Sequence, residues 1–294
     1  MDAREQHTAF DAVHPAVAAV YVVFTLGLTM FSMQPVLICL ALAGALAYGC
    51  CARGWRSCLQ SLRWQLPLVA LVAVANPLFV SSGSTELFRI GSRAVYMEAF
   101  AYGCAMGGLL VASVLWFQAA GNLLGFEAVM SLFGNAAPTV ALMVSMCMRL
   151  IPRFVRQGKQ IAAVQDVVLE EGGDGSRAGG AAAVRARLRQ STVLMGWVME
   201  DSLQTADAMR ARGWGAGRRS TYSRYRFTAA DGWAVAALAA GGVLCAVLAF
   251  EATSQYSFYP AMSSLVAWWG YAPYAAWMLL PTVLHLLEGR GFDA

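Results

Sequence analysis

The sequence predicts an all-α, polytopic membrane protein with about six transmembrane helices and a cytoplasmic helical domain. Two observations predict this class. Hydrophobic residues make up 59% of the 294 residues and charged residues only 13%, whereas roughly a quarter of the residues in a soluble domain are charged. Several stretches also approach the ~20 mostly apolar residues that a helix needs to cross the hydrocarbon core of a bilayer.

The apolar stretches give the order of the expected spans. They lie near residues 13–33, 35–52, 63–81, 94–119, 230–250 and 262–287. The second and third are short, and Pro67 and Pro77 predict a break or a kink in the third because proline disrupts a helix interior. We therefore expect residues 1–120 to hold four transmembrane helices and residues 230–294 to form a C-terminal transmembrane hairpin.

Arginine placement predicts the orientation of these spans. Arg53, Arg56 and Arg63 fall between the second and third spans, and the basic residues 121–229 follow the fourth. Cytoplasmic loops carry the excess of Lys and Arg in membrane proteins. Both termini are thus expected in the cytoplasm. The ratio of 20 arginines to one lysine is typical of a GC-rich bacterial genome, so the membrane is expected to be the bacterial cytoplasmic membrane.

Residues 121–229 form a basic block between the apolar parts of the chain. The block holds 14 of the 21 Lys and Arg residues and eight acidic residues, a net charge of +6, whereas the remainder has seven basic and nine acidic residues. Charge in a membrane protein collects where the chain meets the cytoplasm or a partner. The block is therefore predicted to be a cytoplasmic domain that contacts other proteins.

A first long helix is predicted over residues 137–171, beginning at Pro138 because proline is favoured in the first turn. Four basic residues recur along one face at spacings of four, three and three, namely Arg149, Arg153, Arg156 and Lys159. A broad apolar side carries Met143, Met146, Leu150 and Phe154. Two interpretations stay open: the charges solvate an outer face, or the amphipathic helix docks on a partner or on the membrane surface.

A second long helix is predicted over residues 181–211, after a glycine-rich linker at 172–180. Gly213 is expected to end it, because glycine accepts the left-handed conformation of a helix C-terminus. Arg210 and Arg212 would project from the last turn, where a guanidinium can bind carbonyls or carboxylates of a facing protein. The alternative is that these arginines only complement the helix dipole.

Catalytic chemistry is not apparent in the sequence. His7, His14 and His285 are isolated, and the seven cysteines have no metal-binding spacing. The pair Gly158-Lys159 lacks the glycine and the Ser/Thr of a phosphate-binding loop. We expect a non-catalytic chain with no cofactor, no metal and no nucleic-acid partner.

Several short motifs lie along the chain in an order and spacing that resemble those of a known family, the transmembrane T component of energy-coupling factor (ECF) transporters. They are His14-Pro15, Gln34-Pro35, Asn76-Pro77-Leu78-Phe79, Tyr102-Gly103, Leu115-Trp116-Phe117, Pro138-Thr139-Val140-Ala141-Leu142-Met143, Arg149-Leu150-Ile151-Pro152 and Ala206-Asp207-Ala208-Met209-Arg210-Ala211-Arg212-Gly213-Trp214. The resemblance covers roughly residues 13–232, and its most specific element is Ala211-Arg212-Gly213 in this long setting.

The resemblance implies a role in micronutrient import, of a vitamin or a metal ion. Two cytoplasmic ATP-binding cassette (ABC) ATPases would use ATP and Mg²⁺, and a separate membrane subunit, the S component, would bind the substrate. ATPase docking carries over to Ala211, Arg212 and Gly213, with Arg210 beside them. The first docking motif should follow Gln165, but no arginine occurs there.

Three explanations for the missing arginine stay open: Arg156 or Arg177 substitutes for it, other chemistry replaces it, or the first contact is weak. The apolar residues Met143, Met146, Leu150 and Phe154 are the expected contacts to the S component. Two other functions are alternatives, a membrane scaffold without transport and, less favoured, a lipid-modifying membrane enzyme.

Overall fold

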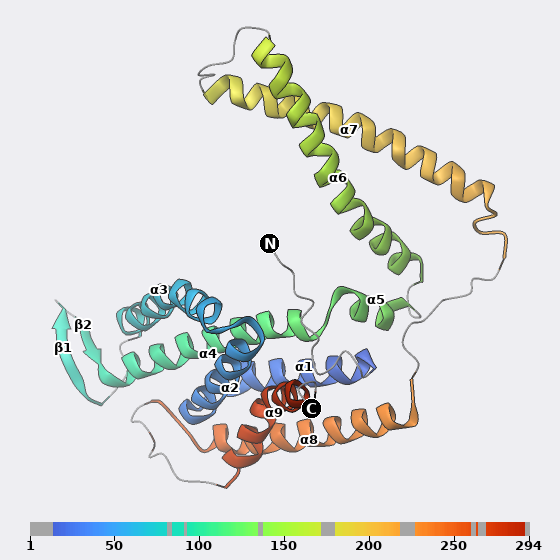
Figure 1. Cartoon of the computed structure of the whole chain (residues 1–294). Helices are drawn as coiled ribbons and strands as arrows, with labels where there is room; N and C mark the ends of the chain where they lie inside the picture. Colours follow the sequence, from blue (N-terminus) through green and yellow to red (C-terminus); the bar gives the residue numbers. More distant parts are fainter. Residues whose placement is uncertain are drawn as a thin grey trace. The chain divides into compact units, whose positions relative to one another are not determined.

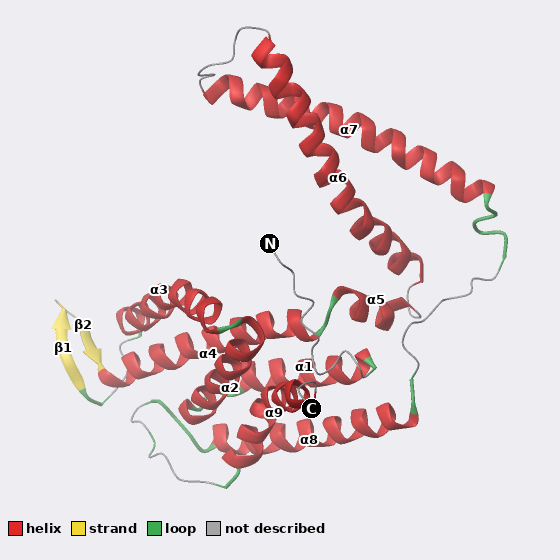
Figure 2. Cartoon of the chain, viewed as in Figure 1, coloured by secondary structure: helices red, strands yellow, loops and turns green. Residues whose placement is uncertain are grey.

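The computed structural model describes residues 14–80, 84–90, 93–134, 138–171, 180–217, 227–259, 263 and 269–291. These ranges contain nine α-helices and one two-stranded β-hairpin (Figure 2). The chain divides into two compact units, Met1–Val129 with Tyr225–Ala294, and Met130–Arg224. We refer to them as the membrane unit and the basic unit and describe each separately.

The membrane unit is built from six long helices (Figure 1). They are α1 (Pro15–Phe31), α2 (Pro35–Arg53), α3 (Trp55–Phe79), α4 (Met97–Leu123), α8 (Ala229–Ser254) and α9 (Tyr271–Gly291). Among the described residues, α2, α3, α4 and α8 are long and apolar enough to cross a membrane, and α1 is a shorter apolar helix of 17 residues. The predicted all-α class is therefore confirmed, with four candidate membrane spans.

Two helix boundaries differ from the predicted spans. Helix α3 begins at Trp55 rather than near residue 63, so Gly54, with φ +82°, is the only residue between α2 and α3. The connection expected to hold three arginines is helical instead. Helix α3 also runs through Pro67 and Pro77 without interruption, so the predicted break is wrong, and the alternative of a kink at these prolines stays a prediction. The last helix begins at Tyr271 rather than near residue 262.

A β-hairpin precedes α4 and was not expected from the sequence. Strands β1 (Glu86–Ile90) and β2 (Arg93–Tyr96) pair antiparallel. The Glu98 carboxylate, in the first turn of α4, accepts hydrogen bonds from Ser84 Oγ (2.7 Å) and from Thr85 N and Oγ1 (3.1 and 2.6 Å). Glu98 therefore fixes the chain that enters β1 to the beginning of α4.

The core of the membrane unit is apolar, and several of its buried aromatic side chains donate hydrogen bonds. Tyr21 is fully buried, and its hydroxyl donates to Trp277 O (3.1 Å), while Trp277 Nε1 donates to Thr25 Oγ1 (3.0 Å). Trp116 Nε1 donates to Ala41 O (3.1 Å). Buried Tyr and Trp side chains are stable when their polar atoms find partners, so these bonds join α1, α2, α4 and α9 at defined positions.

Glycines allow the helices to approach closely. A Cβ at Gly44 would lie 2.8 Å from Met278 O on α9, and a Cβ at Gly103 would lie 3.0 Å from Ala73 Cα on α3. Small residues at such positions are typical of helix packing in membranes, because they let backbones come into contact.

Candidate docking helices of the basic unit

Two long helices form most of the basic unit. They are α6 (Pro138–Glu171) and α7 (Gly180–Ala211), of 34 and 32 residues, which is about 50 Å each at 1.5 Å per residue. The short α5 (Phe126–Gly134) precedes them. Both long helices match the boundaries predicted from the sequence within one residue. The linker predicted at 172–180 lies, except for residue 180, outside the described residues.

Helices α6 and α7 cross near the middle of each. Arg153 forms a salt bridge with Asp201 (3.0 Å) and lies over the Trp197 ring, with its guanidinium carbon 5.1 Å from the ring centroid. Phe154 meets Trp197 edge to face at 5.9 Å. Gln190 Nε2 donates to the backbone carbonyl of Gly158 (2.7 Å). An aromatic contact, a cation–π contact, an ion pair and a hydrogen bond therefore hold one crossing point.

The basic face predicted on α6 has two roles. Arg153 turns toward α7, and its partner Asp201 is largely buried, with a side chain 14% exposed. Arg149, Arg156 and Lys159 are exposed and have no salt bridge in the described ranges. Three of the four cations are therefore exposed, which fits both solvation and docking on a partner, whereas Arg153 positions the second helix.

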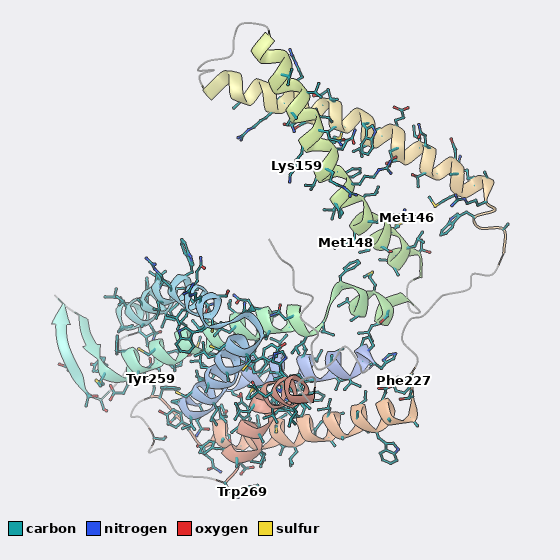
Figure 3. The ribbon with its side chains drawn as sticks, in the orientation of Figure 1. Met146, Met148, Lys159, Phe227, Tyr259 and Trp269 are labelled. Carbon is teal, nitrogen blue, oxygen red and sulfur yellow. The ribbon has the colours of Figure 1, made fainter. Side chains whose placement is uncertain are left out.

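The apolar side predicted on α6 is partly used by the crossing. Phe154 is half-buried against Trp197, and Leu150 and Met146 are half-buried as well, whereas Met143 is 59% exposed. Figure 3 labels Met146, Met148 and Lys159 along this helix. Positions 143, 150 and 154 share one helix face. This face therefore packs on α7 at Phe154 and is exposed at Met143, toward the Pro138 end of α6. Figure 1 shows the two helices diverging toward that end.

Helix α7 carries a second apolar surface that faces away from Trp197. It forms an open groove lined by Leu188, Ser191, Thr192, Met195, Gly196 and Met199. Met195 and Met199 are 67% and 65% exposed, and Leu203, one turn further on, is 68% exposed. Exposed methionines on a helix are typical of surfaces that adapt to more than one partner, because the thioether chain repacks easily.

The C-terminus of α7 ends in a Schellman motif at the predicted glycine. Gly213 has φ +76°, Trp214 N donates to Met209 O (3.0 Å), and Gly213 N donates to Arg210 O (2.9 Å). These two bonds define the motif. The sequence-based expectation that Gly213 ends the helix is confirmed.

Arg212 occupies the cap residue immediately before this glycine. It is exposed, and no carboxylate in the described residues lies within salt-bridge distance of it. Ala211 is exposed as well. Arg210 lies 3.7 Å from Asp207, with both side chains more than three-quarters exposed, and such a pair contributes little to stability. The helix end therefore presents a cationic tip with a fixed backbone.

The position of the first docking motif is only partly described. Gln165 belongs to α6, but its side chain lies outside the described residues, as does the whole of Arg177. Arg156 is exposed on α6. The contact expected near Gln165 stays a prediction.

The described histidines have structural partners. His14 Nδ1 accepts from Ala16 N (3.2 Å) at the beginning of α1, and its ring meets Phe227 edge-on at 5.1 Å. The His285 ring lies 6.5 Å from the Tyr48 ring. Within the described ranges, no group of three His, Cys, Asp or Glu side chains could hold a metal ion. His7 lies outside those ranges.

Comparison with known proteins found no family model that matches the chain and no similar curated protein. The structure itself therefore carries the functional argument. Its four candidate membrane-spanning helices indicate a multi-pass membrane protein.

Proposed function

We propose that this chain is the transmembrane energy-coupling subunit, the T component, of an ECF-type ABC importer for a micronutrient such as a vitamin or a metal ion. In this proposal the chain catalyses nothing itself. Two cytoplasmic ABC ATPases bind ATP and Mg²⁺, and an S component in the membrane binds the substrate. Helices α6 and α7 transmit the movement of the ATPases to the S component.

The observation that carries the proposal is the end of α7. The Schellman motif at Gly213 fixes the backbone, and Arg212 extends from the cap residue without a carboxylate of its own. A guanidinium offers a planar set of donors that suits a groove lined with carbonyls or carboxylates. Ala211, Arg212 and Gly213 are thus the proposed docking residues, with Arg210 beside them and a second contact near Gln165.

The apolar surfaces of the basic unit support contact with a membrane subunit. Met143 is largely exposed on α6, next to the half-buried Met146 and Leu150, and α7 carries its own exposed methionine groove. An exposed apolar surface of this extent is unfavourable in water and typical of an interaction site. We assign the α6 surface to the S component. Phe154 contributes indirectly, because it holds α6 against Trp197.

The remaining features of the proposal concern the membrane. Helices α1 and α9 would complete six spans together with the four long apolar helices, and both termini would lie in the cytoplasm of a bacterium. ATP binding would draw the two ATPases together, move the tips of α6 and α7, and turn the S component until its site faces the cytoplasm. The substrate is chosen by the S component.

A pull-down from detergent-solubilised membranes tests the proposal. Wild-type chain should recover two ABC ATPases, and Arg212→Glu should lose at least one. Truncating one partner of a buried charge pair costs about 2–5 kcal/mol, so Arg212→Ala should weaken ATPase binding by about 30-fold or more at 1.4 kcal/mol per tenfold. Arg189→Glu is the matched control, because Arg189 is an exposed arginine of the same helix and undergoes the same change of charge.

Three results would contradict the proposal in different ways. If wild type recovers no ATPase but another protein, the chain is a scaffold. If purified chain modifies a lipid without an ATPase, it is an enzyme. If Arg189→Glu and Arg212→Glu lose the ATPases equally, general charge rather than the cap holds the complex.

A further inference from the structure

The turn between α2 and α3 is cationic and has no acidic counterpart nearby in the chain. Arg53 ends α2, and Arg56 and Arg63 lie on α3. No Asp or Glu occurs between Asp11 and Glu86. Arg56 and Arg63 are exposed and, within the described residues, neither has a salt bridge. The positive charge of this corner is therefore available to an anion from outside the chain.

The first three turns of α3 have three distinct faces. Cys58 and Gln65 are buried against the unit. Trp55, Leu59 and Leu66, at helical spacings of four and seven, form an apolar face whose members are 70%, 50% and 57% exposed. Arg56 and Arg63 are seven residues apart, close to two full turns, so they lie together beside the apolar face. A strip of apolar residues bordered by cations is typical of helices in the membrane interface.

The length of α3 places this segment at the edge of the bilayer. The helix has 25 residues, about 37 Å, whereas the hydrocarbon core is about 30 Å thick. Both arginines, both glutamines and both tryptophans of α3 lie in the stretch 55–65, and residues 66–79 contain one polar side chain, Asn76. At its Trp55 end the helix therefore exceeds the hydrocarbon by about 7 Å. This end holds Arg56, and Arg63, two turns further along, reaches the headgroups through its long side chain. Trp64, 79% exposed, is a residue favoured at the headgroup level.

Arg53 adds a fixed positive charge behind this surface. Its Nη1 donates to Gln118 Oε1 on α4 (2.6 Å), and the same oxygen accepts from Ser61 Oγ (3.0 Å). Its Nε and Nη2 atoms are buried without a hydrogen-bond partner in the described ranges. A guanidinium that is partly buried and lacks an anion raises the free energy of the fold. A phosphate bound at the corner would lower this free energy through its electrostatic attraction to the Arg53 guanidinium.

We propose that the α2–α3 corner binds the headgroup of an anionic phospholipid. Arg56 and Arg63 hold its phosphate, Trp55 lies at the headgroup level, and Leu59 and Leu66 lie against its acyl chains. The site rests on insertion of the chain into a bilayer and does not depend on ATPase docking. Its charge, its apolar strip and its depth all match a lipid, whereas a small soluble anion would use only the charge.

Native mass spectrometry of the purified full chain tests this site. Phosphatidylglycerol and phosphatidylcholine of equal chain length are titrated in turn. Wild type should retain phosphatidylglycerol preferentially. Each Lys or Arg near an anionic surface contributes about 1 kcal/mol, so Arg56→Gln with Arg63→Gln should weaken phosphatidylglycerol binding about 30-fold at 1.4 kcal/mol per tenfold. Arg187→Gln with Arg189→Gln, two exposed arginines of α7, is the matched control and should bind as wild type does.

Four outcomes would overturn the proposal. They are equal retention of both lipids by wild type, an unchanged corner variant, an equal loss in the control variant, and full displacement of the lipid by inorganic phosphate, which would indicate a small-anion site. If the double variant is not recovered from membranes, each single variant should still lose about fivefold, which is one cation at about 1 kcal/mol.

Discussion

Whether a Gly→Ala substitution stabilises or destabilises α7 should depend on the backbone conformation at the substituted position. Gly213 has φ +76°, and a Cβ added there would meet nothing closer than Ala216 Cβ at 3.9 Å, an ordinary contact. The cost of Gly213→Ala is therefore conformational. A left-handed conformation costs an L-residue about 1–2 kcal/mol. Gly196, within α7, also has open space around it, with nothing within 4 Å of an added Cβ, but there alanine should stabilise the helix by about 0.5–1 kcal/mol.

The same substitution should therefore have opposite effects at two positions of one helix. Hydrogen exchange followed by mass spectrometry measures this locally, because opening of a helix end does not require global unfolding. In Gly213→Ala, the amides at positions 213 and 214 should exchange about 5- to 30-fold faster, which is 1–2 kcal/mol at 1.4 kcal/mol per tenfold. Gly213→Asn should exchange at an intermediate rate, because asparagine tolerates the left-handed region.

Two results would refute this reasoning. Unchanged exchange in Gly213→Ala would mean that the Schellman motif does not hold the helix end in solution. Faster exchange along α7 in Gly196→Ala would mean that the added methyl group, rather than the backbone conformation, causes the effect. If the docking proposal is correct, Gly213→Ala should also weaken ATPase recovery without removing any charge, since the cap then no longer holds Arg212 in place.

Two further predictions concern packing within each unit. Gly44→Ala should destabilise the membrane unit by about 1–3 kcal/mol, because its Cβ would lie 2.8 Å from Met278 O, whereas Gly27→Ala, with nothing within 4 Å, should be neutral or stabilising; thermal unfolding in detergent compares the two. Trp197→Ala should destabilise the α6–α7 crossing by about 1–2.5 kcal/mol, since it removes an aromatic pair and a cation–π contact. Met199→Ala, at an exposed position of the same helix, should change stability by less than about 0.5 kcal/mol, and equal effects of Trp197→Ala and Met199→Ala would refute the crossing.

The long helices were predictable because their signals are local. Pro138 and Gly213 mark an N-terminus and a C-terminus by backbone chemistry that acts within one turn, and both helices follow accordingly. The apolar runs gave the positions of the membrane-unit helices for the same reason. These features depend on neighbours in sequence, so one sequence is enough to find them.

The features that were not predicted correctly from the sequence depend on tertiary contacts. Arginines at 53, 56 and 63 indicate a loop when they are read as charge alone, but the segment is helical because its other face buries Cys58 and Gln65. The β-hairpin before α4 is fixed by Glu98, whose partners could not be found from the sequence pattern. The sequence likewise predicted Arg153 on a basic face, but not that Asp201 and Trp197 would hold it.

The positions of these contacts decide how α6 and α7 could transmit force. The contacts of the crossing join residues 153–158 to residues 190–201. Arg212, the cap residue of α7, lies 11 residues beyond Asp201, about 16 Å further along the helix axis. No proline interrupts α7, whereas α6 carries Pro152 directly before the crossing, where the backbone bond to the preceding turn is missing. A force applied at the Arg212 tip therefore acts on a continuous helix about a fixed crossing, and α6 has its weakest point beside that crossing. An ATPase that moves the tip would then change the angle between the two helices more readily than it would separate them.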